Sequence, residues 1–239
     1  MELRAEPWIA ARYEILGLLG AGGMGLVYKA QDRRLDRVVA LKLGAPRLVE
    51  SAAACERSML EARAIAALNH PNIATIFEVG ESAGAPVLVL EYLPGGTLRS
   101  RIDARTQSAP DIIACGLEIA DGLSHAHRHG VVHGDVKPEN LMFTDDGRLK
   151  ITDFGVARFT DERTVAVDQE VAGTVKYLAP ECLRGSPADC RTDIYSLGVV
   201  LEEMAAASSM PDAFRSLVEC VTLRDPDRRP SVSRCDRAP

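Results

Sequence analysis

Several features that mark particular classes of protein are missing from this sequence of 239 residues. Positive charge is not in excess, because 28 Lys and Arg are outnumbered by 34 Asp and Glu, and the formal net charge is −6. This balance excludes a general electrostatic attraction to nucleic acid or to an anionic membrane surface. No apolar run approaches the roughly 18 residues of a membrane-spanning helix, and the first residues lack the apolar run of a signal peptide. We therefore expect a cytoplasmic chain without a membrane span.

Cysteine is present, but not in a pattern that binds metal or builds a disulfide framework. The six cysteines are scattered and include no CxxC pair, so we expect reduced thiols. Internal repeats and low-complexity tracts are also lacking. With 46% hydrophobic residues, the chain can bury a sizeable core, either as one large domain or as two lobes.

The pattern of apolar residues divides the chain into a strand-rich part and a helix-rich part. Short apolar runs between Tyr13 and Leu43 predict three antiparallel strands, and an alanine-rich stretch at 51–68 predicts a helix. Two more strands are predicted at 73–80 and 86–92, before a Pro- and Gly-containing linker at 93–98. Beyond the linker, the pattern predicts three helices and two short strands, at 109–130, 193–207, 211–223, 140–143 and 148–152. We expect an α+β fold with a small β-rich lobe and a larger helical lobe, and a ligand site in the cleft between them.

A glycine-rich stretch lies between the first two predicted strands. Residues 19–30 read "LGAGGMGLVYKA" and contain Gly20, Gly22 and Gly25, spaced as GxGxxG and followed by Val27. Glycine lets backbone amides approach phosphate oxygens closely. The motif alone is a weak indication, because dinucleotide-binding folds place a helix after it and strand-like residues follow here. An ordinary glycine-rich hairpin is the alternative.

A lysine and a glutamate in the first part of the chain form a candidate pair. Lys42 stands in "VVALKL", whose apolar residues indicate an inner strand, where a charge needs a partner. Glu61 precedes Ile65 by four residues on the predicted alanine-rich helix, so it lies on the apolar side. Taken singly, each residue would be interpreted as an ordinary solvent-facing charge.

Two polar motifs follow in the helical part. Residues 133–140 read "HGDVKPEN" and combine an acid, a cation and an amide in one loop; "DFG" follows at 153–155. Asn140 and Asp153 offer hard oxygen ligands of the kind that magnesium prefers. Either motif alone could be a polar surface loop, but the two in this order indicate phosphate and metal chemistry.

This ordered set of motifs resembles the eukaryotic-like (Hanks-type) serine/threonine protein kinases of bacteria. The resemblance runs from about Tyr13 to Pro230 and includes "GTVKYLAPE" at 173–181, "TDIYSLGV" at 192–199 and "RDPDRRPS" at 224–231. It implies one protein kinase domain of two lobes, an N-lobe at 13–91 and a shortened C-lobe at 92–239. The implied activity is transfer of the γ-phosphoryl group of ATP to a Ser or Thr hydroxyl of a protein substrate. The implied cofactors are ATP and Mg²⁺, or Mn²⁺ in its place.

The resemblance also implies roles for single residues. Phosphoryl transfer depends mainly on positioning and charge neutralisation. Asp135 would orient the acceptor hydroxyl and take its proton, and Lys137 and Thr174 would act near the γ-phosphoryl group. Asn140 and Asp153 would hold the metal. The implied nucleotide-binding residues are Leu19, Gly20, Ala21, Gly22, Gly23, Met24, Gly25, Leu26, Val27, Ala40, Lys42, Glu61, Glu91 and Leu93.

The chain departs from the family at Gly134, where the commonest loop has arginine. That arginine normally receives the phosphate of a residue in the activation loop, here between Gly155 and Ala179. We hypothesise that activity does not strictly require loop phosphorylation, because a phosphate there lacks its usual cationic partner. Thr160 and Thr164 could still be autophosphorylated.

A second departure is a shortened helical lobe. Only "AAASSM" separates Met204 from Pro211, where the family usually has several dozen residues that dock protein substrates. This favours an alternative function, a pseudokinase-like binding or scaffold module, whereas the presence of every catalytic group opposes it. The family also pairs Glu181 with a late arginine, here Arg229. The histidines at 125, 127 and 129 lie where a helix ends before the catalytic loop, and we interpret them as structural.

Overall fold

The computed structural model describes residues 7–22, 25–44, 52–82, 85–154, 175–206 and 208–230. Its backbone contacts divide this part of the chain into two compact units. The first unit contains the described residues up to 69 together with 74–92, and the second contains 70–73 and the described residues from 93 onward. Two predicted site residues of the glycine-rich stretch, Gly23 and Met24, lie outside the described residues, as does Thr174.

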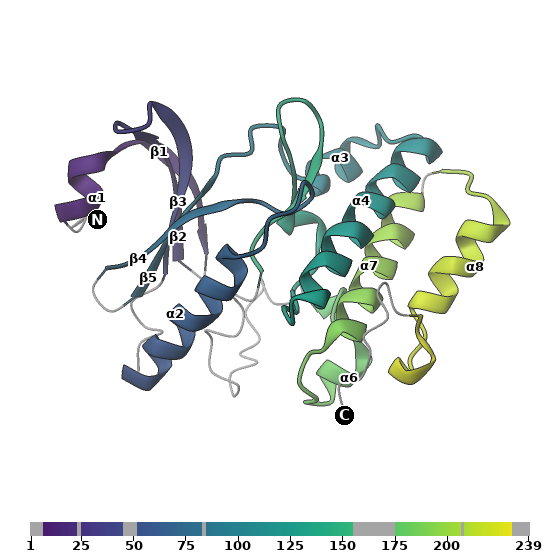
Figure 1. Ribbon diagram of the computed structural model, residues 1–239. Coiled ribbons are helices and arrows are strands. Elements are labelled where there is room, and N and C mark those ends of the chain that lie inside the picture. The colour runs from purple at the N-terminus through teal and green to yellow at the C-terminus, as the bar shows by residue number, and fades with distance from the viewer. Residues whose placement is uncertain are drawn as a thin grey trace. The chain divides into compact units, whose positions relative to one another are not determined.

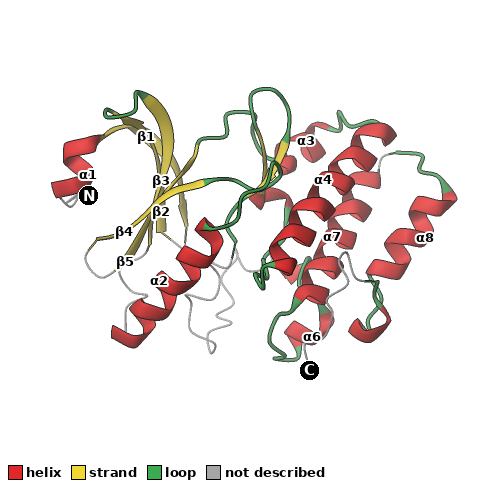
Figure 2. Cartoon of the chain, viewed as in Figure 1, coloured by secondary structure: helices red, strands yellow, loops and turns green. Residues whose placement is uncertain are grey.

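The first unit is built on an antiparallel sheet of five strands in the order β1-β2-β3-β5-β4 (Figures 1 and 2). The strands are β1 (Tyr13–Gly22), β2 (Gly25–Asp32), β3 (Arg37–Gly44), β4 (Ile76–Ser82) and β5 (Ala85–Glu91). They match the five strands predicted in this part of the sequence. Strand β5 pairs with both β3 and β4, so β4, the strand after the helix, lies at one edge of the sheet.

The two faces of this sheet carry different sets of residues. Val27 lies opposite Lys42 and Lys29 opposite Ala40 in the β2–β3 register. Directly opposed residues share a face and successive residues alternate, so Val27, Ala40 and Lys42 lie on one face. The other face carries a core cluster that Ile9 of α1 (Pro7–Arg12) completes. This cluster consists of Ile9, Tyr13, Ala30, Val39, Leu41, Val87 and Val89.

Helix α2 (Ala52–Ala66) packs against β4 and β5, and it corresponds to the helix predicted at 51–68. Its buried side includes Ala62 and Ile65, while Leu60 is exposed. Glu61 is half-buried beside Ala62. Glu61, predicted on the apolar side of this helix, is thus neither fully buried nor fully exposed.

The second unit is mainly helical, with a small two-stranded sheet (Figure 2). Its elements are α3 (Leu98–Ala104), α4 (Ala109–Arg128), η2 (Pro138–Asn140), β6 (Leu141–Phe143), β7 (Leu149–Ile151), α6 (Pro180–Leu183), α7 (Cys190–Ala205), α8 (Asp212–Val221) and η4 (Pro226–Arg228). Helix α4 packs against both α7 and β7. The largest fully buried side chains here include Ile112, Ile119, Leu123, Leu141, Leu149 and Ile151.

Local chemistry explains where the two long helices begin and end. Ser108 and Asp111 form a reciprocal capping box at the start of α4, and Gly130 follows its C-cap in a left-handed conformation (φ 73°). Asp189 caps α7 in the same way together with Thr192. The predicted start of this helix at residue 193 was therefore too late, because the capping residue lies before the motif used to place it.

Helix α8 packs directly on α7 (Figure 1). A Cβ added to Gly198 of α7 would come within 2.6 Å of the side chains of Val221 and Thr222, so glycine permits this close approach. The short connection after Met204 thus leads straight into a packed helix. Although the C-lobe is shortened, α8 covers α7 on this side.

Candidate active site

The loop at 133–140 is held by a buried carboxylate from α7. Asp193 has no exposed surface and accepts hydrogen bonds from the backbone N–H groups of His133 (2.9 Å) and Gly134 (2.8 Å). Its Oδ2 also lies 2.7 Å from Nε2 of His127, which accounts for that histidine as a structural residue. Sequence reasoning gave Asp193 no role. The available signal was an aspartate within an apolar helix, because such a residue must be paired.

His133 connects this loop with the "DFG" motif. Its Nε2 lies 2.8 Å from the carbonyl oxygen of Thr152, and its Nδ1 lies 3.1 Å from the backbone nitrogen of Asp135. A carbonyl can only accept and a backbone N–H can only donate, so Nε2 carries the proton and Nδ1 accepts. The ring also packs against Phe154, with 4.6 Å between the ring centroids. Both motifs are thereby fixed to each other.

The acid, the cation and the amide of the loop form one cluster. Nζ of Lys137 lies 2.8 Å from Oδ2 of Asp135, and Nδ2 of Asn140 donates to the same oxygen at 3.0 Å. The Asn140 amide also donates to the backbone carbonyl of Asp135 at 2.8 Å. The side chain of Asp135 is 9% exposed, so its charge is stabilised mainly by these partners. This confirms that the residues predicted from "HGDVKPEN" meet in space.

Asn140 and Asp153 emerge at the same end of the β6–β7 sheet. Leu141 pairs with Ile151, and both the N–H and the hydroxyl of Thr152 donate to the carbonyl of Asn140 (2.8 and 3.0 Å). Asp153 therefore follows a residue bonded to Asn140. Its φ of 61° is left-handed, a conformation that costs a non-glycine residue roughly 1–2 kcal/mol and is frequent at functional sites.

The donor atoms of this pair fit a divalent cation. The amide nitrogen of Asn140 is engaged by Asp135, which leaves Oδ1 as its ligand atom, and Asp153 supplies a carboxylate. Among the described residues, no group of three or more His, Cys, Asp or Glu is placed to hold a metal. An ion held by two protein oxygens needs further ligands from water and substrate phosphates, which is the usual coordination of magnesium.

The first unit carries most of the predicted nucleotide-binding residues. Lys42 is 5% exposed on the inner strand β3, as its apolar neighbours predicted. Val27 and Ala40 share its face of the sheet. Glu91 ends β5, and its N–H donates to the carbonyl of Thr75 (2.9 Å).

The glycine-rich stretch is a hairpin between β1 and β2. Gly22 pairs with Gly25 and Gly20 with Val27, and the pairing shifts register between Leu18 and Gly20. Gly25 adopts φ 125°, which glycine permits. A Cβ added to Gly20 would meet nothing within 4 Å, so absence of a side chain there is not required for packing. Leu19 and Ala21 are exposed and Leu26 is half-buried, whereas Leu93, predicted for the adenine edge, is buried in the second unit.

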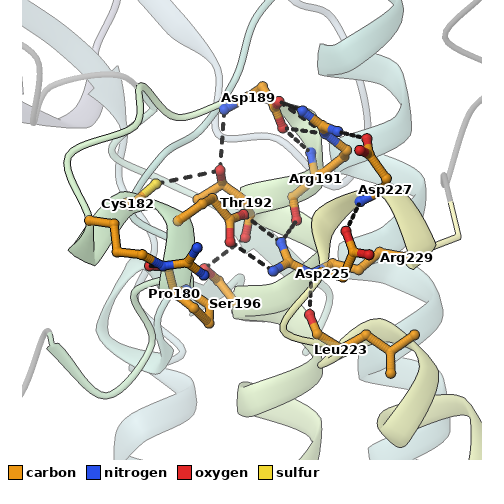
Figure 3. A network of polar contacts seen from close by, with 12 residues as sticks. Pro180, Cys182, Asp189, Arg191, Thr192, Ser196, Leu223, Asp225, Asp227 and Arg229 are labelled. Carbon is orange, nitrogen blue, oxygen red and sulfur yellow. Dashed lines mark hydrogen bonds and ion pairs between the residues drawn. The ribbon is translucent and has the colours of Figure 1, made fainter.

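The predicted pairing of Glu181 with Arg229 is confirmed. Nη1 and Nη2 of Arg229 donate to the two carboxylate oxygens of Glu181 at 2.6 and 2.8 Å. Arg229 also donates to the carbonyls of Leu223 (2.7 Å) and Arg191 (3.0 Å), as Figure 3 shows. Burial raises the pKa of Glu181, but the Arg229 guanidinium outweighs it and holds this pKa below its ordinary value. The pair fastens α6 to the segment that follows α8.

Histidine and cysteine side chains are the other titratable groups considered near these elements. His125 stacks between His70 and His129, with ring centroids 4.9 and 4.4 Å away, and burial and these neighbours lower its pKa. The cysteines that lie in the described ranges, at 115, 182, 190 and 220, are thiols. Within the same ranges, no helix is both long enough and apolar enough to cross a membrane.

Comparison with known proteins gives a consistent result. A family model described as "Protein kinase domain" matches residues 13–211. The serine/threonine-protein kinase PknL of Mycobacterium tuberculosis is 35% identical over 248 residues, covering 92% of this chain and 62% of PknL. The serine/threonine-protein kinase PrkC of Bacillus subtilis is 38% identical over 197 residues, covering 82% of this chain and 30% of PrkC. The chain thus spans less than two thirds of either relative.

A solved structure has the same fold. The crystal structure of the PknI kinase domain from Mycobacterium tuberculosis aligns with a TM-score of 0.73 and 25% sequence identity. The alignment covers 93% of this chain and 92% of that domain.

Proposed function

This chain belongs to the protein kinase family, and on that premise we propose that it transfers the γ-phosphoryl group of ATP to a serine or threonine hydroxyl of a protein substrate. The observation that carries this proposal is the cluster of Asp135, Lys137 and Asn140, fixed to Asp153 through the β6–β7 sheet. Together with Asp153, it supplies a base, a cation and two metal ligands. The curated relatives are serine/threonine kinases, which supports this acceptor class.

Asp135 acts as the base in this proposal. Lys137 and Asn140 hold its carboxylate through Oδ2, and Asp193 and His133 accept from the backbone N–H groups of residues 133–135. The carboxylate orients the acceptor hydroxyl and accepts its proton as the hydroxyl oxygen bonds to the phosphorus. The bond from phosphorus to the leaving oxygen of ADP breaks in the same transfer. Lys137 neutralises charge on the transferred group, with Thr174 hydrogen-bonding nearby.

The nucleotide is held by groups with different chemistry. Bound magnesium, or manganese in its place, would neutralise charge on the phosphates, and Asn140 and Asp153 are the residues that would hold it. Backbone amides of the glycine-rich hairpin at 19–27 cover the phosphates, and Lys42, held by Glu61, contacts the α- and β-phosphates. Val27 and Ala40 contact the adenine ring, whose edge bonds the backbone between Glu91 and Leu93.

The proposed kinase domain consists of an N-lobe at 13–91 and a C-lobe at 92–239. The alternative of a pseudokinase-like binding module rested on the shortened C-lobe. Because α8 packs on α7 where the chain is shortened, and every proposed catalytic group is present in the sequence, no observation favours that alternative.

Transfer of labelled phosphate from ATP tests this proposal. The chain is incubated with labelled ATP, Mg²⁺ and dephosphorylated casein, and the modified residues are identified by mass spectrometry. We expect label on Ser and Thr, and a loss of at least about 100-fold in Asp135→Asn, because a general base contributes 10²–10⁴ in rate. Asp145→Asn, at an exposed turn after β6, is the matched control and keeps native activity. Equal labelling by Asp135→Asn and the native chain contradicts the proposal.

A further inference from the structure

A single arginine joins three segments of the second unit next to the candidate active site. Nε of Arg99, on α3, donates to Glu139 of η2 at 2.9 Å. Its Nη1 and Nη2 donate to the two carboxylate oxygens of Glu203 on α7 at 3.0 and 3.2 Å. Nη2 also donates to the hydroxyl of Tyr177, which lies in the segment before α6 and itself donates to Glu203. All three guanidinium nitrogens therefore donate, Nε to Glu139 and both Nη atoms to Glu203.

Three members of this cluster are largely withdrawn from water, whereas the side chain of Glu139 is 47% exposed. The side chains of Arg99 and Glu203 are 25% and 17% exposed, and Tyr177 is buried. Burial raises the pKa of Glu203, but Arg99, Tyr177 and Lys176 outweigh it and lower the pKa to about 2. Burial and the bond to Glu203 raise the pKa of Tyr177, so its hydroxyl stays protonated. The guanidinium accordingly meets a carboxylate that stays charged and a hydroxyl that accepts from Arg99 while donating to Glu203.

The position of Arg99 in the sequence opposes local helix preference. It is the second residue of α3, and a cation in the first turn of a helix faces the positive end of the helix dipole. The first turn contains no acidic residue to offset this charge. Departures from local preference are expected where a residue serves a larger arrangement. The contacts of Arg99 with η2 and α7 provide that arrangement.

Two of the three segments that Arg99 joins adjoin residues with proposed catalytic roles. Glu139 directly precedes Asn140, whose amide holds Asp135, and it lies two residues after Lys137. Tyr177 lies three residues after Thr174. We propose that Arg99 is a positioning residue that fixes the catalytic loop at 133–140 relative to the segment at 175–177. This inference rests on the proposed kinase function. It adds a residue that neither the motifs nor the family resemblance pointed to.

Kinetics of Arg99 variants test the proposal. Arg99→Met keeps the aliphatic part of the side chain and removes the guanidinium group. We therefore expect kcat for phosphorylation of dephosphorylated casein to fall at least ten-fold. KM for ATP should stay within two-fold, because no residue of the cluster belongs to the proposed nucleotide contacts. Arg99→Lys supplies a charge that cannot reach three acceptors. Its kcat should lie between that of the native chain and that of Arg99→Met. Tyr177→Phe removes one acceptor at nearly constant volume and should also lower kcat.

Arg101 provides the matched control. It lies on the same helix and stacks over Phe143, 3.2 Å from the ring centroid, without joining the cluster. Arg101→Met should keep kcat within two-fold of native. A native kcat in Arg99→Met, or equal losses in the Arg99 and Arg101 variants, overturns the positioning role.

Hydrogen exchange separates failure of this inference from failure of the proposed function. The amides of Asn140 and Leu178 are hydrogen-bonded within the two joined segments, to the carbonyls of Lys137 (2.9 Å) and Val175 (3.2 Å). Their protection should fall in Arg99→Met and persist in Arg101→Met, measured on the full chain without nucleotide. If the native chain transfers no phosphate but this difference appears, the proposed function is wrong and the positioning role stands. Unchanged protection in Arg99→Met contradicts the positioning role.

Discussion

The buried carboxylate of Asp193 accepts a hydrogen bond from the backbone N–H of Gly134 at 2.8 Å, one residue before the proposed base Asp135. A side chain of α7 thus determines the path of the catalytic loop. His133 and His127 approach the other oxygen of the same carboxylate. The loop therefore depends on a residue far away in the sequence.

We predict that Asp193→Asn destabilises the protein and impairs catalysis. An amide can accept from only one side, so a buried N–H loses its charged acceptor at a cost of about 2 kcal/mol. Urea unfolding followed by circular dichroism measures this loss, and labelled-phosphate transfer measures activity. Glu219→Gln, on the exposed side of α8, should change neither. Native stability in Asp193→Asn would show that the carboxylate does not carry the loop.

Alanine substitutions at Gly134 and Gly130 distinguish the effect of backbone strain on stability from an effect on catalysis. Both adopt left-handed conformations, at φ 76° and 73°, and a Cβ finds space at each. Replacing either with alanine should lower the free energy of unfolding by about 1 kcal/mol. Only Gly134→Ala should also reduce phosphoryl transfer, because only that glycine donates to Asp193 beside the base. Equal activities in the two variants would refute this distinction.

The charge of Glu203 makes stability depend on acidity. Its pKa in the folded protein is about 2, against an ordinary value of 4.5. A lowered pKa means that the stabilisation is fully present above pH 4.5 and is lost as the pH falls toward 2. In urea unfolding measured at several pH values across this range, the free energy of unfolding of Glu203→Gln should therefore fall less with decreasing pH than that of the native protein. Glu202→Gln, exposed on the same helix, should follow the native curve.

Activity should not require phosphorylation of the loop between Gly155 and Ala179. Gly134 occupies the position of the family's arginine and offers no cation to a loop phosphate. The double variant Thr160→Ala, Thr164→Ala should retain at least half of the native rate, compared with native chain pretreated with phosphatase. A ten-fold loss at an unchanged melting temperature would show that loop phosphorylation is needed.

The local elements could be predicted because their signals are local. Short apolar runs predicted the five strands, and the alanine-rich stretch at 51–68 predicted helix α2. The motif residues Asp135, Lys137 and Asn140 stand close enough in sequence that one turn of η2 brings them together. Prediction failed at the start of α7, where Asp189 caps the helix, and it overlooked α1 and α3, whose apolar patterns are too short to stand out.

The order of motifs, the family and the types of side chain available for phosphate chemistry can all be read from the residues alone. Tertiary structure alone decided how those side chains are held. Asp193, Arg229 and Arg99 are a buried acid and two largely covered arginines whose partners come from distant segments. No local pattern encodes such partners, because a charge withdrawn from water is stabilised by whatever the packed chain brings within hydrogen-bonding distance.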